Sequence, residues 1–119
     1  MAQRILLVED DQDQADLYQS VLAMAGYEVT ASYDAETALA RLAEGAYDLT
    51  LVDWDLPGMK GDAFITQVQA RAPKVKTVLF SNHFDVDDAA RACHADAWLL
   101  KSEGIQRLRE TLARVLQQG

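Results

Sequence analysis

Five short apolar segments alternate with five longer segments of helical periodicity along this chain, and this alternation limits the fold more than any other feature. Most of the apolar segments are continuous apolar runs, which is typical of strands buried on both faces of a sheet. Alternation of such strands with helices predicts repeated βα units around a parallel sheet. The predicted strands are Arg4 to Val8, Tyr27 to Ala31, Asp48 to Val52, Lys76 to Phe80 and Ala97 to Leu100.

The segments between the strands place apolar residues on one face of a helix. These stripes are Tyr18, Val21, Leu22 and Ala25; Ala35, Ala38, Leu39 and Leu42; Phe64, Ile65 and Val68; Val86, Ala89, Ala90 and Cys93; and Ile105, Leu108, Leu112 and Val115. We expect Asp34 and Ser102 to cap helix starts, and Gly26 and Gly45 to adopt left-handed conformations after helix ends. Right-handed crossovers and short connections then predict a doubly wound, five-stranded parallel sheet with helices on both faces.

The composition restricts the classes of function. The 119 residues are 50% hydrophobic and 25% charged, which predicts a single folded domain over residues 1–119 with its output elsewhere. The net charge of -8 repels nucleic acid and anionic membranes, so we expect no direct binding to either. Cys93 is the only cysteine, and the first apolar run is too short for a signal peptide or a membrane span. These features predict a cytoplasmic protein.

Polar side chains follow four of the predicted strands at the point where each strand ends. They are Glu9, Asp10 and Asp11 after the first strand, Asp53 after the third, Ser81 after the fourth and Lys101 after the fifth. Ligands of an open parallel sheet bind at the carboxyl ends of its strands, so we expect these side chains to gather at one edge. Asp11 is the exception, because an acidic residue at a helix start is more simply interpreted as a solvated cap.

This set of side chains predicts phosphoryl chemistry. Gathered carboxylates repel one another by about 4 kcal/mol per close pair at a moderate dielectric, so a cation must offset them. Oxygen ligands without His or Cys favour Mg²⁺ over zinc, and Lys101 supplies further positive charge. A phosphoryl group held there would find Ser81 as a hydrogen-bond donor and Asp53 as an in-line nucleophile.

Over essentially its whole length the chain resembles the receiver domains of bacterial two-component response regulators. The matching motifs are Ile5-Leu6-Leu7-Val8-Glu9-Asp10-Asp11, Asp53-Trp54-Asp55-Leu56-Pro57-Gly58-Met59-Lys60-Gly61, Ser81 and Lys101, in that order. The resemblance implies a flavodoxin-like sheet with strand order 2-1-3-4-5. It also implies a signalling switch that is not an enzyme beyond its own phosphorylation and dephosphorylation.

The resemblance further implies a metal site and a phosphorylation site. Glu9 and Asp10 would form an acidic pair, and Asp10 and Asp53 would bind Mg²⁺ together with the main-chain carbonyl of Asp55. Asp53 would receive the phosphoryl group from a phosphohistidine of a sensor histidine kinase or a phosphotransfer protein.

The same resemblance implies how the signal leaves the site. Ser81 and Lys101 would hold the phosphoryl oxygens, and Trp98 would be the switch aromatic. Their movement would change the face formed by the fourth helix, fifth strand and fifth helix, which would engage an unidentified downstream effector. Phosphorylation-dependent dimerisation is a further family-level expectation.

Several positions depart from the family pattern, and two other functions compete with this interpretation. Ser102 stands where receiver domains usually have proline, Asn82 where they have a small residue, and His83 and Asp55 flank the expected phosphoryl position. The first alternative is a phosphatase of the haloacid dehalogenase type, because Asp53-Trp54-Asp55 matches its Asp-x-Asp motif. That motif follows the first strand in those enzymes, whereas here it follows the third. The second alternative is a receiver-like module that binds partners without being phosphorylated.

Overall fold

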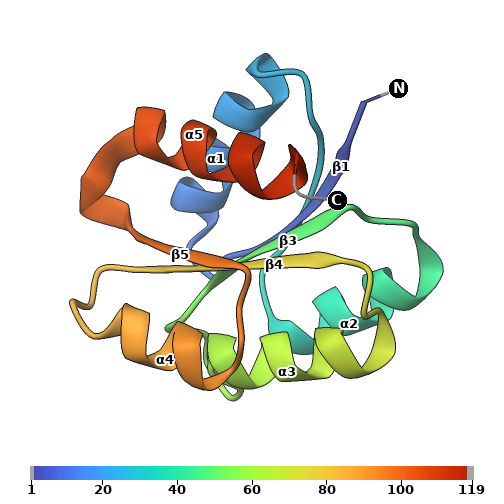
Figure 1. The fold of residues 1–119 in the computed structure, drawn as a ribbon. Coiled ribbons are helices and arrows are strands. Elements are labelled where there is room, and N and C mark those ends of the chain that lie inside the picture. The colour runs from blue at the N-terminus through green and yellow to red at the C-terminus, as the bar shows by residue number, and fades with distance from the viewer. Residues whose placement is uncertain (1, 118–119) are drawn as a thin grey trace.

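A computed structural model describes residues 2–117, which form a five-stranded parallel sheet between two layers of helices (Figure 1). The strands are β1 (Arg4–Val8), β2 (Glu28–Ser32), β3 (Leu49–Asp53), β4 (Lys76–Ser81) and β5 (Ala97–Leu100). The helices are α1 (Gln12–Met24), α2 (Ala35–Glu44), α3 (Gly61–Arg71), α4 (Val86–Ala92) and α5 (Gly104–Gln117), with a short 3₁₀ turn, η1 (Lys101–Glu103), before α5. The strand order β2-β1-β3-β4-β5 confirms the predicted flavodoxin-like topology.

The two helix layers explain why the strands are apolar on both faces. Helices α1 and α5 cover one face of the sheet, and α2, α3 and α4 cover the other (Figure 1). Alternate residues of β1 point to opposite layers: Leu6 and Val8 pack with α2, α3 and α4, whereas Ile5 and Leu7 pack with α1 and α5. These four side chains of the strand are thereby buried, so no polar alternation is needed.

The reversal of strand order lies between β1 and β3. From β1 the chain goes outward to β2 and then returns to the other side of β1 as β3. Val8 and Val52 are aligned in register, so Glu9 and Asp53 leave the sheet side by side. This is the switch point at which open parallel sheets bind ligands.

Side chains of the residues just before α1 and α2 cap those helices. The carboxylate of Asp11 accepts from the backbone N–H of Gln14 at 3.1 Å, and that of Asp34 accepts from Thr37 at 2.7 Å. Both residues therefore confirm the interpretations made from sequence. The expectation for Ser102 was wrong: it lies within η1, a turn that Glu103 closes by accepting from the backbone N–H of Leu100 at 2.8 Å.

The helix ends follow the glycine predictions only in part. Gly26 has φ of 99° and is left-handed as expected, whereas Gly45 has φ of -119° and is extended. His94 occupies a left-handed position after α4, with φ of 60°. Its N–H donates to Arg91 O at 3.2 Å, and Ala95 N–H donates to Ala90 O at 2.9 Å, which is the Schellman pattern.

Some element boundaries differ from the predicted ones. Strands β2 and β3 begin one residue later than expected, and β3 and β4 extend through Asp53 and Ser81. Ile105 is 40% exposed, so the buried stripe of α5 begins at Leu108 and not at Ile105. Among residues 2–117, none of the helices has the length and apolar character needed to cross a membrane.

Candidate functional site

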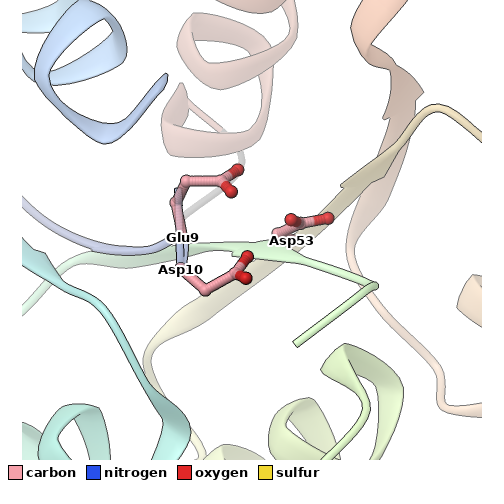
Figure 2. A group of neighbouring side chains, drawn as sticks. All are labelled: Glu9, Asp10 and Asp53. Atoms are coloured by element: carbon pink, nitrogen blue, oxygen red, sulfur yellow. The ribbon is translucent and has the colours of Figure 1, made fainter. Parts of the chain in front are cut away.

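Three carboxylates meet where β1 and β3 end. Glu9 and Asp10 directly follow β1, and Asp53 is the last residue of β3. Figure 2 shows the three side chains directed toward a common space, and each offers an oxygen within 4.8 Å of the others. Glu9 and Asp53 are 1% and 4% exposed, whereas Asp10 lies on the surface. A cluster made only of carboxylates suits a hard cation such as Mg²⁺.

The ammonium of Lys101 lies against this cluster. Its Nζ donates to Glu9 Oε2 at 2.8 Å, to Gln14 Oε1 at 2.8 Å and to Asp53 Oδ2 at 3.3 Å. The Lys101 side chain is only 9% exposed, and its Nζ lies 5.0 Å from the centre of the Phe80 ring. The cation predicted from sequence therefore reaches the carboxylates, although Lys101 follows the edge strand β5.

The charges at the site shift the pKa values of two of its members. Burial raises the pKa of Glu9 to about 7, and the nearby charge of Asp53 adds to this effect, although Lys101 opposes it. Burial lowers the pKa of Lys101, but its hydrogen bond to Glu9 and the charges of Asp53 and Glu9 outweigh this, so the pKa is raised overall. Lys101 thus keeps its proton. One ammonium does not fully offset the buried negative charge, which leaves a demand for a further cation.

Ser81 ends β4 at the same edge of the sheet. Asp53 pairs with Phe80 across the sheet, so Ser81 lies one residue beyond this pair. Ser81 is fully buried, and its Oγ accepts from the backbone N–H of His83 at 3.0 Å. Because a hydroxyl both accepts and donates, its proton remains able to bond an oxygen held at the site.

The side chain of Asp55 is engaged outside the carboxylate cluster. Asp55 Oδ2 lies 2.8 Å from His83 Nε2, and Oδ1 lies 3.6 Å from Lys60 Nζ. Its backbone N–H donates to Asp53 Oδ1 at 3.1 Å, which orients the carboxylate of Asp53. With its carboxylate paired in this way, Asp55 would serve a metal through its main-chain carbonyl, as the resemblance implies.

A glycine lets α3 pack directly on the backbone that carries Asp53. Gly61 N–H donates to Trp54 O at 2.9 Å. A Cβ at Gly61 would lie 2.7 Å from Trp54 Cα and would also collide with the carbonyl of Asp53. Only glycine therefore fits at the first position of α3 without moving the loop that holds the site.

The remaining sequence-predicted residues lie around the site or away from it. Asn82 is exposed, and Ser102, one residue past Lys101, does not prevent the ammonium from reaching the cluster. Trp98 lies on β5, 39% exposed, with the guanidinium of Arg91 5.1 Å from its ring centre. The structure thus places the predicted switch aromatic at the surface, away from the carboxylates.

Two contacts at the site were not anticipated from sequence. Gln14 bonds Lys101, and Lys60 lies near Asp55. The position of Gln14 in the first turn of α1 could have indicated its contact with the site, because that turn starts at the same sheet edge as Glu9. Nothing in the spacing of Lys60 distinguishes it from an ordinary surface lysine.

The sequence and the fold were compared with those of known proteins. The family described as the response regulator receiver domain matches residues 5–113. The transcriptional regulatory protein ZraR of Salmonella typhimurium is 32% identical over 114 residues, covering 94% of this chain and 26% of that protein. The chain thus spans about a quarter of the length of that relative.

Solved structures show the same fold. A CheY-like response regulator receiver domain from Methanospirillum hungatei has a TM-score of 0.92 at 26% identity, covering 99% of this chain and 96% of that one. The response regulator TrrA of Thermotoga maritima, solved in complex with Mg²⁺ and BeF, has a TM-score of 0.86 at 27% identity, covering 95% and 98%.

Proposed function

The chain belongs to the response regulator receiver domain family, and on this premise we propose that it is a two-component signalling switch that is phosphorylated on Asp53. The observation that supports this role most directly is the contact of Lys101 Nζ with Asp53 Oδ2 at 3.3 Å, across 48 residues of sequence. A buried carboxylate beside a cation and two further acids is suited to accept a phosphoryl group.

The donor set fits Mg²⁺. Asp10 and Asp53 would hold the ion with the main-chain carbonyl of Asp55, and Glu9 would complete the acidic pair. The carboxylate oxygens of Glu9, Asp10 and Asp53 lie close enough together to share one small cation, and no His or Cys belongs to this group of described residues. When bound, the ion supplies positive charge that neutralises phosphoryl oxygens.

The protein's own residues account for the transfer. A carboxylate oxygen of Asp53 attacks phosphorus and forms the new P–O bond, while the bond from phosphorus to the donor breaks and its electron pair stays with the donor. Lys101 neutralises charge on the phosphoryl oxygens, and the Ser81 hydroxyl donates a hydrogen bond to one of them. Glu9 keeps the Lys101 ammonium in place through its 2.8 Å bond.

The switch would work by a shift in population between two conformations. A phosphoryl group on Asp53 adds negative charge that attracts Lys101 and the Ser81 hydroxyl, so the state that makes these contacts gains population. Trp98 would report this change at the face formed by α4, β5 and α5. Its exposed ring beneath Arg91 supports a side chain able to change orientation.

We further propose the partners of this domain. A sensor histidine kinase or phosphotransfer protein would supply the phosphoryl group from a phosphohistidine, and a downstream effector would read the α4–β5–α5 face. The net charge of -8 supports protein partners over direct contact with nucleic acid. Its relative ZraR is a transcriptional regulatory protein about four times as long, so any output module is to be sought outside the receiver.

Mass spectrometry after incubation with acetyl phosphate and Mg²⁺ tests the proposal. We expect wild type to gain the mass of one phosphoryl group, and Asp53→Asn to gain none because its amide is not a nucleophile. Asp16→Asn is the matched control, since Asp16 is exposed on α1 away from the site. Chelation of Mg²⁺ should prevent the gain in wild type.

Two outcomes would contradict the proposal. A wild-type protein that stays unmodified would favour the partner-binding module without phosphorylation. A mass gain that persists in Asp53→Asn would mean that another side chain is the acceptor.

A further inference from the structure

The ammonium of Lys101 has three protons, and three different residues accept them. Glu9 and Gln14 each accept at 2.8 Å, and Asp53 accepts at 3.3 Å. A lysine ammonium has no further donors, so its hydrogen-bonding capacity is filled. Glu9 and Asp53 belong to the acidic cluster, whereas Gln14 is neutral and lies outside it.

The main chain of Gln14 is held in place independently of its contact with Lys101. Gln14 lies in the first turn of α1, and its backbone N–H donates to the Asp11 carboxylate at 3.1 Å. The helix cap therefore fixes the main chain from which the Gln14 side chain extends. Its amide oxygen reaches a lysine that is 87 residues further along the chain.

The bond from Gln14 affects how closely the ammonium approaches Asp53. Since the two short bonds go to Glu9 and Gln14, Asp53 keeps the longest of the three. Loss of the Gln14 oxygen would leave an unpaired proton on a largely buried ammonium, which is unfavourable. The ammonium would then be drawn more closely onto the two carboxylates, because opposite charges attract more strongly than a neutral amide does.

We propose that Gln14 is a positioning residue that holds the Lys101 ammonium beside Asp53 without letting it occupy the carboxylate. The inference rests on the phosphoacceptor function proposed above. An ammonium held at 3.3 Å neutralises the incoming phosphoryl oxygens while it engages Asp53 Oδ2 only weakly, so this carboxylate can still attack. An ammonium drawn onto Asp53 weakens that nucleophile and takes the space of the phosphoryl group.

The substitution Gln14→Met tests the role, because methionine keeps the length of the side chain and removes the acceptor oxygen. We expect the maximal rate of phosphorylation by acetyl phosphate to fall about tenfold, the scale of one hydrogen bond to a charged group. Gln12→Met is the matched control: Gln12 is exposed on the same helix turn, and its substitution should leave the rate unchanged. Gln14→Glu keeps an acceptor oxygen but adds a charge, so it should lose less of the rate than Gln14→Met does.

A double-mutant cycle separates positioning from a general effect on folding. If Gln14 acts through Lys101, then Gln14→Met should change the rate much less in a Lys101→Met background than in wild type. An equal effect in both backgrounds would overturn the proposal. Circular dichroism of each variant checks that the fold is retained.

The Lys101 ammonium can also be observed without any phosphorylation, through the nitrogen–proton NMR signal of its Nζ. A buried ammonium with three acceptors should exchange its protons slowly, and Gln14→Met should accelerate that exchange about tenfold, by the loss of one of the three bonds. Gln14→Glu should restore slow exchange, and Gln12→Met should not alter it.

The phosphorylation rate and the exchange of the Lys101 signal together distinguish the positioning role of Gln14 from the phosphoacceptor function of Asp53. If wild type is never phosphorylated but its Lys101 signal is protected and depends on Gln14, the phosphoacceptor function fails while the positioning contact stands. If wild type is phosphorylated and Gln14→Met reacts at the wild-type rate, the positioning role is overturned and the function stands. Equal exchange of the Lys101 signal in wild type and Gln14→Met would also overturn it.

Discussion

Burial of the Glu9 carboxylate at the site destabilises the fold. The carboxylate is buried beside Asp53, and burial raises its pKa to about 7 from a usual 4.5. A buried acid with a raised pKa favours its neutral form. The fold tolerates the charge because Lys101 Nζ lies 2.8 Å from Glu9 Oε2.

This shift predicts a pH-dependent stability in the absence of divalent metal. Below pH 4.5 Glu9 is protonated in both states, whereas from 4.5 to about 7 the unfolded chain releases a proton that the folded chain keeps. The free energy of unfolding should therefore fall as the pH rises through this window. We expect a loss of about 1–3 kcal/mol relative to Glu9→Gln, measured by urea unfolding with a chelator present.

Glu44→Gln provides the control for this measurement, because Glu44 is exposed on α2. It should keep the wild-type pH profile. If Glu9→Gln and wild type lose stability in parallel between pH 4.5 and about 8, Glu9 is not the group responsible.

At the residue scale, sequence reasoning predicted the ends of strands better than contacts between side chains. Asp53 and Lys101 could be placed because each follows an apolar strand, and parallel strands end at one edge of a sheet. The contacts of Gln14 with Lys101 and of Asp55 with His83 were not predicted, although the first turn of α1 starts at the site and Asp55 and His83 were expected to flank it. These contacts depend on rotamers and on the spacing between a helix and a loop, which periodicity does not specify.

Among the elements, the junction of β3 and α3 limits the site most strictly. Asp53 ends β3, and Gly61 begins α3 against the backbone of Asp53 and Trp54. Helix α3 thus fixes the position of the Asp53 main chain at the edge of the sheet. An altered packing of this helix would change the orientation of the Asp53 carboxylate.

We predict that Gly61→Ala destabilises the fold by about 1–3 kcal/mol, as expected when an atom is forced into a packed interior. The clashing atoms include backbone, which cannot move aside as a side-chain tip can. Phosphorylation of Asp53 should slow as well, because relief of the clash moves its loop. Urea unfolding and acetyl phosphate kinetics measure the two effects.

Gly45→Ala is the matched control for this change. Gly45 has an ordinary φ of -119°, and the atoms nearest to its added Cβ belong to the ring of Tyr47, a side chain that can turn aside. We expect a loss below about 1 kcal/mol and no change in phosphorylation. A Gly61→Ala protein as stable and as reactive as this control would mean that α3 does not fix the loop.

The order and type of the elements could be predicted, but not every boundary. Short apolar segments, most of them continuous runs, marked all five strands, yet Asp53 and Ser81 were placed after strands that in fact include them. The difference arises because a strand continues for as long as its backbone pairs, whatever the side chain. The expected cap at Ser102 failed for a related reason: Glu103 closes the turn with its own side chain, so α5 begins at Gly104.

For the whole molecule, an excess of acid makes a bound cation a source of stability. The net charge is -8, and three carboxylates of the site share one small region. A ligand that binds only the folded state raises stability by mass action. Mg²⁺ should therefore protect the entire domain against unfolding, and not only its binding loops.

We predict that Mg²⁺ at a hundredfold excess over its dissociation constant raises the free energy of unfolding by about 2.7 kcal/mol. Thermal unfolding with and without Mg²⁺, at constant ionic strength, measures the effect. Asp10→Asn should remove most of it by deleting one carboxylate of the cluster, whereas Asp16→Asn should retain it. If sodium alone raised the free energy of unfolding equally, or if Mg²⁺ raised it undiminished in Asp10→Asn, the stabilisation would not come from this cluster.

The separation of 92 positions between Glu9 and Lys101 has a consequence for biosynthesis. A growing polypeptide contains all three acids of the cluster before the ribosome adds the lysine that compensates them, 48 residues after Asp53. Until that point the mutual repulsion of the acids opposes closure of this edge. Shortened translation products that stop before β5 lack this ammonium, so we expect their acidic edge to stay less ordered than that of the folded domain.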